Sequence, residues 1–126
     1  MVAAKTVKEV MSRQFLSVGA STDLLAVSQL MAQRDVGSVL VKSGGQFVGI
    51  ITETDLVRKV MAKSISPTDV TAESVMSYPV ATIDAEASLE QAHIKMGEQN
   101  IRHLLVTHAG RPVGLISVRT LLEALT

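Results

Sequence analysis

The chain of 126 residues contains no cysteine, and aromatic side chains make up only 2% of it. The absence of cysteine excludes disulfides, thiolate metal sites and a cysteine nucleophile. Twelve basic and twelve acidic residues leave no formal net charge. A nucleic-acid-binding protein would need a positive surface and stacking rings, so we expect no direct nucleic-acid partner.

Long apolar runs are also missing. No run approaches the roughly 18 residues that a membrane span needs, and residues 1–8 hold no apolar core of signal-peptide length. We therefore expect a cytoplasmic protein without a membrane span. The composition, 47% hydrophobic and 19% charged, is typical of a globular and slightly apolar domain. Apolar surface would remain for a second copy to cover, which predicts a homodimer.

The strongest pattern is an internal repeat, in which Val10-Met11-Ser12 recurs as Val75-Met76-Ser77. The same frame also pairs Leu24 with Leu89, Met31 with Met96, Val41 with Val106, Val48-Gly49 with Val113-Gly114, Ile51 with Ile116, and Leu56 with Leu121. Core aliphatics and glycines that coincide in one frame indicate two copies of one unit. We predict domains at 1–65 and 66–126, joined by a linker rich in serine, proline and aspartate at 63–69.

Each copy is predicted to hold a short strand, a helix, a hairpin and a second helix. In the first copy these are an extended piece at 16–18, a helix at 23–34 capped by Asp23, strands at 38–42 and 47–52, and a helix at 53–62. In the second copy they are a helix capped by Ser88 and Gln91, strands at 102–107 and 112–117, and a helix at 118–124. The fold class is therefore α+β, with two β-α-β-β-α repeats. Each repeat leaves one sheet face uncovered, so we expect them to pack sheet to sheet about a pseudo-two-fold axis.

The stretch from Gly49 to Asp55, with the sequence GIITETD, joins a strand to a helix. Thr52 and Asp55 place a hydroxyl and a carboxylate at that junction. A helix start offers N–H groups that suit phosphate, and a carboxylate can accept hydrogen bonds from a diol, so the stretch is typical of a nucleotide cradle. A capping box that only starts the helix has the same residues. The local pattern leaves both interpretations open.

The tandem repeat, the order of elements and this stretch together resemble a pair of cystathionine β-synthase (CBS) domains, a Bateman module, from about Val7 to Leu125. GIITETD is similar to the family's Gly-hydrophobic-x-Ser/Thr-x-x-Asp ribose motif. The resemblance implies a regulatory sensor without catalysis, not an enzyme. It would bind an adenosine-containing ligand such as AMP, ADP, ATP, NAD or S-adenosylmethionine, and would signal to an effector protein that the sequence does not identify. A structural homodimerisation module with vestigial ligand sites is the alternative.

The resemblance also implies roles for single residues. Asp55 would hold the ribose hydroxyls, and Thr52 would contact the ribose or the first phosphate. In the second repeat Ser117 keeps the hydroxyl, but Thr120 stands where the acid should be, so one adenosyl ligand per chain is expected. The other ligand-binding residues implied are Arg102, His103 and Arg119 for the phosphates, and Ile50, Pro79, Val80 and Ala81 for the adenine.

Arg102 and His103 would point to opposite faces of a regular strand, so both can reach a phosphate only where the strand has not yet begun.

Other polar residues are interpreted as structural. The basic residues Arg58, Lys59 and Lys63 are interpreted as a solvated face near a helix C-terminus, in preference to a role in binding polyphosphate or a partner. The three histidines, His93, His103 and His108, do not have the i, i+4 spacing of helical metal ligands, so we expect no metal site. No serine lies in a Gly-x-Ser-x-Gly elbow, which leaves nucleophilic catalysis without support.

Overall fold

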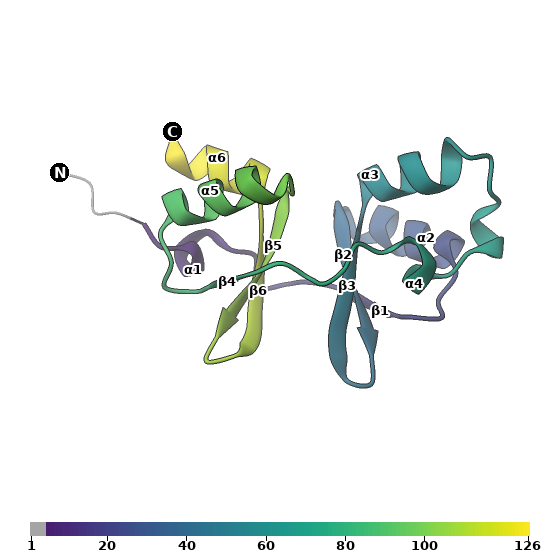
Figure 1. Cartoon of the computed structure of the whole chain (residues 1–126), viewed down its shortest axis with the longest axis horizontal. Coiled ribbons are helices and arrows are strands. Elements are labelled where there is room, and N and C mark those ends of the chain that lie inside the picture. The colour runs from purple at the N-terminus through teal and green to yellow at the C-terminus, as the bar shows by residue number, and fades with distance from the viewer. Residues whose placement is uncertain (1–4) are drawn as a thin grey trace. The chain divides into compact units, whose positions relative to one another are not determined.

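The computed structural model describes residues 5–126 and divides into two compact units, each with helices on one face of its own sheet (Figure 1). Residues 16–80 form what we call the central unit, and residues 5–15 together with 81–126 form the terminal unit. This division differs from the predicted one at residue 65. Residues 66–80 belong with the first hairpin, and residues 5–15 belong with the second. Residues 1–4 of the predicted first domain lie outside the described residues.

The central unit contains a three-stranded sheet in the order β1-β2-β3, with β1 parallel to β2 and β2 antiparallel to β3. Its elements are β1 (Ser17–Gly19), α2 (Leu24–Arg34), β2 (Ser38–Ser43), β3 (Gln46–Thr52), α3 (Glu53–Asp55), the π-helix η1 (Leu56–Met61), the 3-10 helix η2 (Pro67–Asp69) and α4 (Ala72–Val75). The helix predicted at 53–62 is thus a short α-turn that continues as a π-helix, and the predicted linker contains η2.

The terminal unit repeats this topology with the strand order β4-β5-β6. Its elements are α1 (Val7–Val10), β4 (Thr82–Asp84), α5 (Leu89–Gln99), β5 (His103–His108), β6 (Arg111–Ser117) and α6 (Val118–Leu125). The predicted α+β class with two repeats is confirmed. The packing of the two sheets on each other stays a prediction.

Side chains start the two longest helices as predicted. The Asp23 carboxylate accepts a hydrogen bond from the backbone N–H of Ala26 at 2.9 Å, which caps α2. In α5 the capping box is complete, because Gln91 N–H donates to the Ser88 hydroxyl at 3.1 Å while the Gln91 side chain accepts from Ser88 N–H at 2.8 Å. These caps fix where the two helices begin.

Each unit has its own apolar core between sheet and helices. The buried core of the central unit consists of Leu24, Val27, Met31, Val39, Val41, Ile51, Val60, Ala72 and Val75. The buried core of the terminal unit consists of Val7, Ile83, Ala85, Leu89, Ala92, Met96, Leu104, Val106, Ile116 and Leu121. Leu89, Ala92 and Met96 recur at i, i+3 and i+7 along α5 and lie in this core, so the methionine there is a packing residue.

A short helix from elsewhere in the sequence completes each core. In the central unit α4 precedes Ser77, which exchanges two backbone hydrogen bonds with Ile50 of β3 at 2.9 and 3.0 Å. In the terminal unit α1 precedes Ser12, which forms the same pair of bonds with Leu115 of β6 at 2.8 and 2.9 Å. The repeated Val-Met-Ser sequence therefore ends at the same backbone bridge in both units.

Candidate functional site

The junction of β3 and α3 is a capping box. The backbone N–H of Thr52 donates to Asp55 Oδ2 at 2.9 Å, and the Thr52 hydroxyl donates to the same oxygen at 3.2 Å. The backbone N–H of Asp55 in turn donates to Thr52 Oγ1 at 3.4 Å. The alternative interpretation of this stretch, a box that starts the helix, therefore describes contacts that are present. These contacts also hold the carboxylate at a fixed position beside the hydroxyl.

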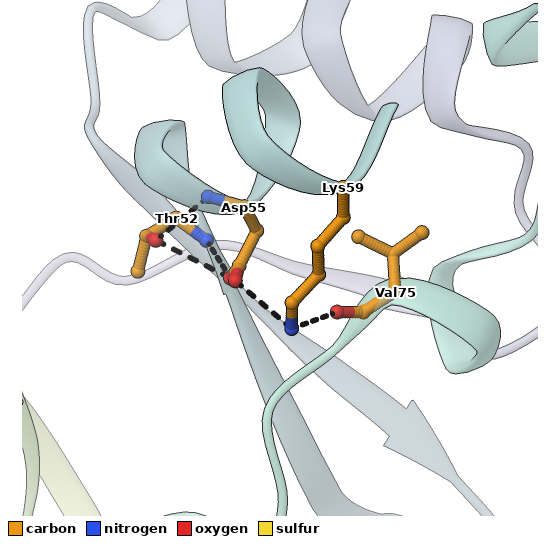
Figure 2. Close-up of polar contacts among 4 residues, drawn as sticks. All are labelled: Thr52, Asp55, Lys59 and Val75. Carbon is orange, nitrogen blue, oxygen red and sulfur yellow. Dashed lines mark hydrogen bonds and ion pairs between the residues drawn. The ribbon is translucent and has the colours of Figure 1, made fainter. Parts of the chain in front are cut away.

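Lys59 is a third partner of this carboxylate (Figure 2). Its ammonium lies 3.1 Å from Asp55 Oδ1 and donates to the backbone carbonyl of Val75, at the end of α4, at 2.8 Å. The Asp55 side chain is 10% exposed and that of Lys59 is 41% exposed. The interpretation of Lys59 as part of a solvated face is therefore wrong. The i, i+4 spacing of an acid followed by a base is the signal in the sequence that indicates this pair.

Within the central unit the backbone also brings the predicted adenine-contacting segment toward β3. Ile50 is bridged to Ser77, and Pro79 and Val80 follow in the chain. Ile50, Thr52 and Val80 are half-buried, and Pro79 is exposed. The central unit thus holds five of the predicted ligand residues, three of them on β3 and α3.

The terminal unit gathers three more predicted residues around the start of α6. Ser117 caps this helix, since it accepts from the backbone N–H of Thr120 at 3.2 Å, and it pairs with His103 in the β5–β6 register. The Arg102 carbonyl accepts from Val118 N–H at 2.8 Å. β5 begins at His103, so Arg102 is exposed and precedes the strand. Arg102 and His103 could contact the same phosphate only if at least one of them lies before the strand.

Two further predicted residues of the terminal unit lie outside a cap. The Arg119 side chain is 88% exposed and pairs with Glu123 at 3.4 Å, a contact that adds little stability in water. Ala81, a predicted adenine contact, is half-buried, and its carbonyl accepts from Leu105 N–H at 2.9 Å. That these residues share a ligand with Asp55 stays a prediction.

In place of the acid, Thr120 has a hydroxyl that accepts from the Ser117 hydroxyl at 3.2 Å. The cap of α6 therefore has the same form as that of α3 without a carboxylate. A hydroxyl cannot take up a vicinal diol as a carboxylate can with its two oxygens. The chemistry available at the two caps is unequal, as the sequence predicts.

Residues 5–126 contain no cluster of three or more histidine, cysteine or acidic side chains that could hold a metal ion. Over the same residues, every helix is too short or too polar to cross a bilayer.

The fold and these caps define a class of protein: a tandem module of two α+β repeats, each with a hydroxyl residue where its hairpin passes into a helix. The chain belongs to the CBS domain family, whose model matches residues 7–62 and 72–126.

Three known proteins illustrate this relationship. An uncharacterized protein of Methanopyrus kandleri is 30% identical over 120 residues, which cover 94% of this chain and 61% of that protein. A candidate signal-transduction protein with CBS domains from Burkholderia ambifaria has a structure with a TM-score of 0.90 at 28% identity, covering 96% of this chain and 93% of the other. Hypoxic Response Protein I, whose structure holds two coordinated zinc ions, has a TM-score of 0.78 at 26% identity, covering 97% of this chain and 100% of the other.

Proposed function

We propose that this chain is a regulatory module without catalysis that binds an adenosine-containing ligand and transmits its presence to an effector protein. Asp55 would accept hydrogen bonds from the ribose hydroxyls, and Thr52 would contact the ribose or the first phosphate. Membership of the CBS family supports the proposal, because CBS domains generally bind adenosine ligands. Ligand binding regulates only if it favours one conformation over another.

The observation that carries the proposal is the carboxylate of Asp55. The residue is only 8% exposed, although it is ionisable, and it stands beside the Thr52 hydroxyl at a strand-to-helix junction. Acidic side chains are seldom buried unless they are paired, and Lys59 pairs with this one. Its fixed place beside the hydroxyl, rather than its burial, therefore supports the ribose role. The equivalent cap of the second repeat, Ser117 with Thr120, has no such acid, which supports one ligand site of this kind per chain.

Thermal unfolding with AMP, ADP, ATP, NAD and S-adenosylmethionine, each tested separately, examines the proposal. A ligand at 100 times its dissociation constant is expected to add about 2.7 kcal/mol to the free energy of unfolding. For a domain of this size that corresponds to a rise in Tm of roughly 10 °C. GMP, which keeps ribose and phosphate but changes the base, is the matched control. The absence of a rise with every adenosine ligand at millimolar concentration would refute the proposal.

A structural homodimerisation module is the second candidate function, and two observations favour it. The hydrogen bonds of Thr52 and Lys59 already give Asp55 partners inside the chain. Val57 and Leu122, at equivalent positions of the two repeats, are 55% and 46% exposed. A second copy could cover these two side chains and remove their apolar surface from water.

Replacing Val57 and Leu122 by aspartate is expected to raise the dissociation constant of a homodimer at least tenfold, because a carboxylate would have to lose its water at the interface. Sedimentation equilibrium measures this change. Val57→Thr with Leu122→Thr, which removes apolar surface without adding charge, should have a smaller effect. Unaltered association of the aspartate variant would exclude these side chains from the interface.

A further inference from the structure

Lys59 joins two structural features that are distant in sequence. Its ammonium is shared between Asp55 Oδ1 and the Val75 carbonyl, at 3.1 and 2.8 Å (Figure 2). The carbonyls of the last turn of a helix lack intrahelical partners, so Lys59 satisfies the end of α4 while it neutralises the acid of the candidate site. A residue that serves only solubility would make neither contact.

The hydrogen bonds of Asp55 leave it little capacity for a ligand. A carboxylate has about four acceptor positions on its two oxygens. Oδ2 accepts from the backbone N–H and the hydroxyl of Thr52, and Oδ1 accepts from Lys59. A vicinal diol needs two positions. The Lys59 ammonium is charged, so it also draws electron density from the carboxylate and makes both oxygens weaker acceptors.

Three groups donate to the Asp55 carboxylate: the N–H and the hydroxyl of Thr52, and the ammonium of Lys59. Lys59 is well suited to give up its contact when a ligand binds. The Thr52 N–H is part of the backbone at the cap and cannot leave it. Lys59 has a flexible four-carbon stem and is 41% exposed, so its ammonium can exchange the Asp55 carboxylate for water at little cost. It would retain the Val75 carbonyl as a partner.

We infer that Lys59 is an intramolecular competitor of the ligand's ribose diol for Asp55, and so lowers the affinity of the site. This inference rests on the proposed function, because it concerns the same carboxylate. Its consequence is that occupancy by a ligand is coupled to the end of α4 through the lysine that both share.

The test compares wild type, Lys59→Met and Arg58→Met by calorimetric titration with adenosine, an uncharged probe. Lys59→Met keeps the apolar stem but removes the competing charge, and is expected to bind adenosine about two- to fivefold more tightly, the range for a partly exposed ion pair. Arg58→Met removes the same charge from an exposed neighbouring position and should match the wild type. Lys59→Gln, which can still donate to the Val75 carbonyl, replaces Lys59→Met if that variant does not fold.

Salt provides a second measurement. Raising the ionic strength screens the half-exposed pair, so the affinity of the wild type for adenosine should rise, whereas that of Lys59→Met should stay constant. Equal or weaker binding by Lys59→Met, or the same gain in Arg58→Met, would overturn the inference and leave the proposed function in place. A wild type that binds no adenosyl ligand would overturn both.

Discussion

Replacing Gly49 by alanine is expected to lower the free energy of unfolding by about 1–3 kcal/mol, the usual cost of overpacking a core. A Cβ at this position of β3 would lie 2.7 Å from Met76 Cγ and 2.9 Å from Met76 Cβ, and would overlap the thioether sulfur. Rotation of the methionine side chain can move Cγ and the sulfur but not Cβ. The backbone bonds between Ser77 and Ile50 hold Met76 in place, so the strain cannot be relieved locally. Denaturant unfolding measures the loss.

Gly97 offers a matched control for this prediction. It lies within α5, and no heavy atom lies within 4 Å of a Cβ added there. Gly97→Ala is expected to stabilise the protein by about 0.5–1 kcal/mol through helix propensity. Combining Gly49→Ala with Met76→Ala should recover part of the loss, since the sulfur and Cγ are removed but Cβ remains. If Gly49→Ala is as stable as the wild type, Met76 does not pack against Gly49 as closely as the prediction requires.

The repeat in the sequence has a physical explanation in this contact. Met76 covers Gly49 in the central unit, and Met11 covers Gly114 in the terminal unit. Methionine and glycine recur together because each long, flexible side chain needs a missing Cβ opposite it. The pattern was visible from the sequence as coinciding identities. That the methionine of one repeat packs on the glycine of the other was not, since local sequence does not specify which of two equivalent surfaces a short helix covers.

Elements with strong local signals were predicted well. The caps at Asp23 and Ser88 each have one dominant hydrogen-bonding solution, and the glycine-containing turns fix the hairpins. The π-helix at Leu56–Met61 was predicted as ordinary helix, because its side-chain pattern differs little from that of an α-helix. The role of Lys59 was missed for another reason. Its contact with Val75 depends on where α4 packs, which is a tertiary outcome.

Replacing Asp55 by alanine is expected to weaken adenosyl-ligand binding at least 100-fold and to abolish the ligand-dependent rise in Tm, because the proposed site then lacks its only carboxylate. The same change removes the acceptor for Thr52 N–H and the partner of Lys59, so the free energy of unfolding should also fall by about 1–2 kcal/mol. Calorimetric titration and thermal unfolding measure the two effects separately.

The two effects distinguish ligand sensing from a purely structural role, since a vestigial cap predicts the loss of stability but no binding of an adenosyl ligand by either the wild type or the variant. Asp69→Ala removes an equal charge from an exposed position of the same unit and should leave both quantities near the wild type. Asp55→Asn can still accept from the Thr52 N–H, so it should recover much of the stability. It carries no negative charge, so its acceptor is weaker and the diol should remain poorly bound. An Asp55→Ala protein that still binds an adenosine ligand as tightly as the wild type would show that the ribose lies elsewhere, and the capping box would then be the whole role of this residue.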